Sequence, residues 1–213
     1  MSIRIVFFDC DGTLTPVKSS WQYLHERLGL WDDHADEFQK LFRAGKIDYA
    51  EFCRRDAALW KGIPEQRVLD ITGEIPYHKG VKETVQAIKD AGITTVILST
   101  GLTFLVDRVR QDLGMTLSMA NELVVKEGIL TGESKINVEH DNKGYWVGKI
   151  LENMGLRKEE AVAVGDGEGD QGMFEAVGLA IGYHPAPKIV PFLNHVLYNG
   201  SFRKVFEVLR AYR

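Results

Sequence analysis

The chain has 213 residues, of which 45% are hydrophobic and 26% are charged, and its formal net charge is −4. This composition predicts a globular protein with a full core and argues against nucleic acid as a partner, because Lys and Arg are scattered along the chain. No apolar run is long enough to span a membrane, the run that ends at Asp9 is too short for a signal peptide, and two cysteines, Cys10 and Cys53, are too few for a disulfide framework. We therefore expect a cytoplasmic protein without membrane or nucleic-acid partners.

The chain begins with a predicted strand and continues with a long stretch in which we expect helices alone. Residues 3–8, IRIVFF, are β-branched and aromatic with little alternation, which indicates a strand buried on both faces. Consecutive helical patterns follow at 21–28, 32–42 and 49–61. These patterns predict an all-helical cap domain over residues 17–76, inserted after the first strand of a core domain that comprises 1–16 and 77–213.

Strands and helices alternate in the rest of the chain. The expected strands are 94–99, 161–165, 179–182 and 195–198, and the expected helices are 81–91, 103–113, 142–154 and 201–212. Residues 121–138 interrupt this order and predict two or three short strands around Lys126-Glu127-Gly128. Alternation of this kind indicates right-handed βαβ units, so the predicted fold class is α/β, a Rossmann-like parallel sheet with a helical cap.

Two carboxylates, Asp9 and Asp11, directly follow the first predicted strand. Ligands of open α/β sheets bind beyond the carboxyl ends of the strands, and residues two apart in extended chain project to the same side. Two close carboxylates are costly unless a cation neutralises them or one holds a proton. Mg²⁺ is the natural cation for such a pair, although the two residues could also simply end the strand.

Polar residues also follow two later strands. Ser99 and Thr100 offer hydroxyl and backbone donors suited to a phosphate oxygen, and Asp166 and Asp170 lie just past the strand at 161–165. Lys143, which opens a helix between these strands, has the compact charge that suits an anionic phosphoryl group. Taken singly, each of these residues also has an ordinary structural explanation, as a cap, a surface lysine or an acidic turn.

The ordered set of motifs resembles that of the haloacid dehalogenase superfamily. The set consists of DxDGT after an apolar strand, Ser99, Lys143 and GDxxxD at 165–170. Within that superfamily, residues 118–132 and 162–181 make the chain most similar to the phosphoserine phosphatase group. The resemblance implies that Asp9 is a nucleophile that forms an aspartyl-phosphate and that Asp11 is the general acid and base. It further implies a Mg²⁺ site formed by Asp9, the Asp11 backbone carbonyl and Asp166, with Asp170 in support. It also implies a phosphate site formed by Ser99, Thr100 and Lys143.

The implied activity is Mg²⁺-dependent hydrolysis of a small phosphomonoester, a phosphorylated metabolite. Asp11 argues against a dehalogenase, which needs no acid for a leaving alcohol, and the absence of apolar spans argues against a membrane ATPase. Phosphoserine phosphatase proper and a phosphotransferase with the same intermediate remain alternatives, and an inactive binding module is the least favoured. The oligomeric state is not readable from the sequence.

The cap departs from the group that it resembles. Phosphoserine phosphatases use a cap glutamate nine residues after the nucleophile and an arginine on a later cap helix, and the corresponding positions here are Lys18 and Asp56. This reversal of charge predicts that phosphoserine is not the best substrate and that a negative group near Lys18 is favoured. Arg54 and Arg55 are close enough to Asp56 for a small shift in alignment to restore the arginine. Gly169 stands where the group usually has asparagine.

Overall fold

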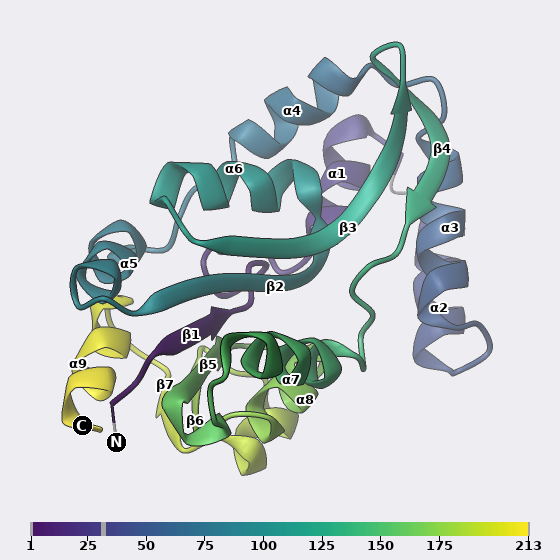
Figure 1. Cartoon of the computed structure of the whole chain (residues 1–213). Coiled ribbons are helices and arrows are strands. Elements are labelled where there is room, and N and C mark those ends of the chain that lie inside the picture. Colours follow the sequence, from purple (N-terminus) through teal and green to yellow (C-terminus); the bar gives the residue numbers. More distant parts are fainter. Residues whose placement is uncertain (1, 31–32, 213) are drawn as a thin grey trace.

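A seven-stranded sheet forms the centre of the computed structural model, which describes residues 2–30 and 33–212 (Figure 1). The strand order is β4-β3-β2-β1-β5-β6-β7, and all neighbours are parallel except β3 and β4. The strands are β1 (Ile5–Phe8), β2 (Thr94–Leu102), β3 (Leu117–Lys126), β4 (Ile129–Lys135), β5 (Ala161–Gly165), β6 (Leu179–Tyr183) and β7 (His195–Leu197). The predicted α/β fold class is confirmed.

Helices cover both faces of this sheet. One face packs against α5 (Val81–Asp90), α6 (Thr103–Leu113) and α9 (Arg203–Ala211), and the other packs against α7 (Lys143–Met154) and α8 (Gln171–Glu175). Along β1, Val6 and Phe8 belong to the first apolar cluster, whereas Ile5 and Phe7 belong to the second. The unbroken apolar run of β1 is thus explained, because alternate side chains enter two separate cores.

In the described part of the chain, four helices lie between β1 and α5 and form the cap (Figure 1). They are α1 (Ser20–Leu28), α2 (Asp33–Arg43), α3 (Tyr49–Leu59) and α4 (Glu65–Gly73). The predicted insertion of helices after the first strand is confirmed, but α4 was not predicted, and residue 32 of the second predicted helix lies outside the described residues. Asp48 caps α3 by accepting the backbone N–H of Glu51 at 2.7 Å.

The β3–β4 hairpin extends from the core sheet to the cap. Its turn has Glu127 and Gly128 in the left-handed region, with φ of 53° and 75°, and its strands add Leu123 and Leu130 to the apolar cluster of the cap. The backbone N–H of Gly62 donates to the Leu130 carbonyl at 2.9 Å. The cap therefore shares its core with strands that belong to the α/β domain. The predicted limits of the cap domain, residues 17 and 76, stay a prediction.

Every helix in the described part of the chain is too short or too polar to cross a lipid bilayer.

Candidate active site

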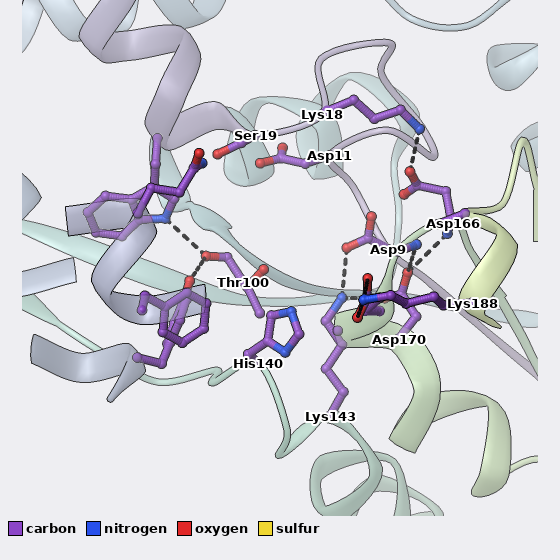
Figure 2. A pocket seen from close by; sticks show the side chains of 18 of the residues that line it. Asp9, Asp11, Lys18, Ser19, Thr100, His140, Lys143, Asp166, Asp170 and Lys188 are labelled. Atoms are coloured by element: carbon purple, nitrogen blue, oxygen red, sulfur yellow. Dashed lines mark hydrogen bonds and ion pairs between the residues drawn. The ribbon is translucent and has the colours of Figure 1, made fainter. Parts of the chain in front are cut away.

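The carboxyl ends of β1, β2 and β5 meet under the cap and line one cavity of about 950 Å³ (Figure 2). Strand β1 lies between β2 and β5, so Asp9 occupies the middle of the cavity floor, with Thr100 on one side and Asp166 on the other. Ligand sites of open α/β sheets lie at this kind of position, where neighbouring connections leave in opposite directions.

Lys143 joins two of the acidic residues on the floor. Its Nζ lies 2.7 Å from Asp9 Oδ1 and 2.6 Å from Asp170 Oδ1, and the Asp170 Oδ2 atom accepts the backbone N–H groups of Asp166 and Gly167 at 3.0 Å each. Burial lowers the pKa of the Lys143 ammonium, but the charges of Asp170 and Asp9 outweigh it and the pKa is raised overall. Lys143 therefore stays charged and holds both carboxylates in place.

Three buried carboxylates on the floor offer oxygen atoms within 4.8 Å of one another: those of Asp9, Asp166 and Asp170. Burial raises the pKa of Asp9 well above its ordinary value, with Lys143 opposing, and burial followed by the Asp170 charge raises the pKa of Asp166 to about 6. Burial is the main cause of both shifts, and the neighbouring carboxylates add to it, so the ionised forms of these acids lack full compensation in the site. This cluster of hard oxygen ligands fits a divalent cation.

Asp11 stands apart from this cluster, beside the N-terminus of α1. Its Oδ2 atom accepts the backbone N–H of Ser20 at 2.6 Å, whereas its Oδ1 atom is shielded from solvent and has no hydrogen-bond partner among the described residues. Burial raises the pKa of the Asp11 carboxyl, and the Ser20 hydrogen bonds oppose this effect. Asp11 lines the cavity, and a carboxyl group there with a raised pKa suits proton transfer.

Gly12 lets the chain after β1 pass close to Asp166. Its φ is +86°, and a Cβ atom there would lie 2.4 Å from Asp166 Oδ2. Thr13, the next residue, donates from its hydroxyl to Asp166 Oδ1 at 3.1 Å. The DxDGT motif therefore positions the acid at the end of β5 as well as its own two aspartates.

Ser99 and Thr100 lie differently at the end of β2. The Ser99 side chain is fully buried, accepts the Gly101 backbone N–H at 3.0 Å and is not part of the cavity wall, so its predicted contact with phosphate stays a prediction. Thr100 lines the cavity. Its carbonyl oxygen accepts hydrogen bonds from Trp21 Nε1 at 3.1 Å and from the Tyr49 hydroxyl at 2.8 Å, and so fastens the cap to the sheet.

Of the four residues considered for substrate selection, Lys18 alone lines the cavity. Its Nζ lies 2.5 Å from Asp166 Oδ2 (Figure 2). Asp56 is 2% exposed, inside the cap, with Oδ1 3.4 Å from His25 Nε2, and Arg54 and Arg55 bind Glu51 on the outer part of α3. Direct contact of these last three residues with substrate stays a prediction that this arrangement does not favour.

Sequence reasoning missed much of the cavity lining, both in the cap and in the loops after later strands. The missed lining residues are mainly aromatic or basic and include Phe42, Tyr49, Phe52, His140, His184 and Lys188. Trp21 belongs to the apolar cluster of the cap and also lines the cavity. The aromatic residues at 49 and 52, three apart on one helix, are the signal that could have indicated a shared face.

The model of the haloacid dehalogenase-like hydrolases matches residues 6–175, and the chain belongs to this family. A phosphoserine phosphatase of Methanocaldococcus jannaschii is 30% identical over 208 residues, which cover 97% of this chain and 98% of that protein. One of Archaeoglobus fulgidus is 31% identical over 182 residues, or 85% of this chain and 52% of that protein. A solved structure described as a substrate-bound phosphoserine phosphatase complex has a TM-score of 0.85 at 26% identity and covers 98% of this chain and 99% of that one. Within the family, the chain is a phosphatase of the phosphoserine phosphatase-like group, as its motifs predicted.

Proposed function

We propose that the protein hydrolyses a small phosphomonoester with Mg²⁺, through a phosphoryl group carried on Asp9. The observation that carries this proposal is the pairing of two different aspartates in one cavity. Asp9 is held by Lys143 in the middle of the floor, and Asp11 keeps a shielded oxygen without a partner among the described residues. The first arrangement suits a nucleophile and the second suits a proton carrier.

The reaction then has two steps. A carboxylate oxygen of Asp9 attacks phosphorus while the bond from phosphorus to the alcohol oxygen breaks, and protonated Asp11 gives its proton to that oxygen. In the second step the Asp11 carboxylate takes a proton from water, and the water oxygen attacks phosphorus and releases Asp9 and inorganic phosphate. The pKa of Asp11, raised by burial, supports the protonated form in the first step.

The remaining floor residues position charge around the phosphoryl group. Asp9, Asp166 and the Asp11 backbone carbonyl would hold Mg²⁺, and Asp170 would support them, because its two oxygens already accept Lys143 and two backbone N–H groups. Bound Mg²⁺ supplies positive charge that keeps the nucleophile ionised and offsets the charge of the phosphoryl oxygens. The Lys143 ammonium and hydrogen-bond donors of Ser99 and Thr100 would bind the phosphoryl oxygens while the phosphoryl group is transferred.

The substrate class is a small phosphorylated metabolite, a proposal supported by the fold shared with a substrate-bound phosphatase. Phosphoserine is the second candidate, because the curated relatives carry that name. Lys18, which stands at the position of the group's cap glutamate and binds Asp166, does not favour it. The enclosure of Asp56 in the cap removes the charge argument at that position. The cytoplasmic location stays a prediction from the sequence.

The proposed function is tested with a panel of phosphomonoesters in the presence of Mg²⁺. We expect turnover by the wild type, none by Asp9→Asn, and unchanged turnover by Asp90→Asn, which alters an exposed aspartate on α5. Release of phosphate and alcohol in equal amounts distinguishes hydrolysis from transfer to a second alcohol. Retention of even a few per cent of activity in Asp9→Asn would contradict the assignment of the nucleophile.

A further inference from the structure

The cavity is larger than its charged floor requires. Its volume of about 950 Å³ lies at the upper end of the range typical of ligand pockets, roughly 300–1,000 Å³. The charged groups gather at the floor, whereas the cap contributes Trp21, Phe42, Tyr49 and Phe52, and His140 completes this side from the loop before α7. We call these five residues the aromatic wall. The space next to it is where the alcohol part of a phosphomonoester must lie.

Four of the five residues of the aromatic wall, all except Trp21, have rings that contact one another. Phe42 stacks on Phe52 with centroids 5.3 Å apart and meets Tyr49 edge-on at 5.7 Å. His140 lies 5.8 Å from Phe42 and 6.5 Å from Tyr49. These spacings are those of favourable aromatic pairs, and a planar ring from a ligand extends such an arrangement with the same geometry.

The polar side-chain atoms of Trp21 and Tyr49 are directed to the protein. Trp21 Nε1 and the Tyr49 hydroxyl both donate to the Thr100 carbonyl, and burial raises the pKa of Tyr49 well above its ordinary value, so the phenol stays neutral. Two of the five residues therefore use their hydrogen-bonding groups to hold the cap and offer mainly ring surface to a ligand.

Charge on the cap side is equally limited. Among the described residues, those of the cap that line the cavity include no acid and no arginine, and Lys18 is bound to Asp166. The ammonium and carboxylate groups of an amino acid would lose water here without gaining partners of opposite charge, which is costly for charged groups.

We propose that the substrate is a phosphomonoester whose alcohol part carries an uncharged aromatic or heteroaromatic ring that packs on the aromatic wall. This inference rests on the proposed phosphatase function. Quaternary ammonium groups also bind among aromatic rings, but they require several ring faces around one point. Phe42 and Phe52 lie 12° from parallel and cover each other's faces, which favours a flat partner over a cationic one.

Four esters and one anhydride separate the possibilities. The esters are 2-phenylethyl phosphate, 2-cyclohexylethyl phosphate, phosphoserine and phosphocholine, and acetyl phosphate reports the chemistry of the floor without an alcohol side chain. We expect kcat/KM for the phenyl ester to exceed that for the cyclohexyl ester by about threefold to tenfold, the usual gain from an aromatic pair beyond buried area. We expect kcat/KM for the phenyl ester to exceed that for phosphoserine by a larger factor than it exceeds that for the cyclohexyl ester.

Variants test whether the wall is responsible. Phe42→Leu and Phe52→Leu, made separately, should each lower kcat/KM for the phenyl ester about threefold to tenfold, and more than for acetyl phosphate. Phe38→Leu is the matched control, because Phe38 lies on the same helix as Phe42 and packs under Arg55 outside the cavity wall. It should leave the ratio of phenyl to cyclohexyl turnover unchanged.

The outcomes are distinct. Phosphoserine or phosphocholine as the best ester overturns the inference and leaves the phosphatase function intact, as does equal turnover of the phenyl and cyclohexyl esters. Loss of the phenyl preference in Phe38→Leu but not in the wall variants also overturns it. If none of the five compounds is hydrolysed, acetyl phosphate included, the proposed function itself is contradicted.

Discussion

The two sides of the cavity are built from different kinds of side chain. The floor consists of buried carboxylates fixed by Lys143, with oxygen atoms whose positions are set by strand ends and backbone N–H groups. The cap side consists of rings from separate helices that contact one another. The difference implies that reaction and selection are carried by separate parts of the molecule. Changes on the floor should alter the rate for every substrate, and changes in the cap should alter the ranking of substrates.

After the loss of turnover expected for Asp9→Asn, the largest effect should come from Asp11→Asn. Loss of the proton carrier should reduce hydrolysis of alkyl phosphates by about 10²- to 10⁴-fold, the usual contribution of general acid–base catalysis. Acetyl phosphate, whose leaving group needs no proton, should be affected much less. Initial rates on both compounds measure the difference, and an equal loss on both would contradict the role of Asp11.

Removal of the Lys143 ammonium from the floor should have the next largest effect. Lys143→Met should lower kcat by about 10²- to 10³-fold for all substrates, as loss of a transition-state donor does. It should also lower the free energy of unfolding, because Asp9 and Asp170 would keep buried charge without their partner. Lys149→Met, on the exposed side of the same helix, is the control for kcat and for the melting temperature. A kcat within threefold of wild type would show that Lys143 is not part of the reaction.

The charge of the floor should also appear in the pH dependence of stability. The pKa of Asp166 is about 6 in the folded protein and 3.8 ordinarily, so the folded state binds this proton more tightly than the unfolded state. Without divalent metal, stability should therefore fall as pH rises from about 4 to 6, by about 2 kcal/mol or roughly 4–8 °C in Tm. Asp166→Asn should show a shallower fall over that range, measured by thermal unfolding in EDTA. Parallel curves for the two proteins would contradict this account.

The smallest effect should come from Lys18, where the cap reaches the floor. Lys18→Met removes a partly exposed ammonium from Asp166, and an exposed ion pair contributes up to about 1 kcal/mol, so Mg²⁺ affinity should rise by up to about fivefold. Calorimetric titration with Mg²⁺ measures the change. Lys188→Met, which removes a cavity lysine that pairs with Glu168, should change the affinity less. Weaker Mg²⁺ binding in Lys18→Met would show that Lys18 supports the metal site.

Most of the floor was predictable because its acids occupy strand ends. A parallel sheet brings its carboxyl ends to one edge, which predicted that Asp9, Asp166 and Asp170 lie close together. Lys143 opens a helix, and its place beside them was implied by the family resemblance. Helix α4 was missed because its sequence, EQRVLDITG, contains three β-branched residues and a glycine, which have low helix propensity. The sequence predicted strands from residue 121, but β3 begins at Leu117 because it also pairs with β2.

The cap side was not predictable from motifs, because its contacts join residues that are distant in sequence. The pair formed by Lys18 and Asp166 spans 148 positions. Asp56 was assigned to the substrate from the alignment alone. Cys53, Asp56, Ala57 and Trp60 are all buried at helical spacing, so the periodicity of α3 places Asp56 in the cap core.

The hydrogen bond from the Ser20 backbone N–H to Asp11 has a kinetic consequence. Ser20 begins the first helix of the cap, and its hydroxyl also accepts the Leu102 N–H at the end of β2. Displacement of α1 would break the bond that orients the proton carrier. A cap that opened by moving α1 would therefore also lose proton transfer, and the proton would be delivered only to an ester enclosed by the cap.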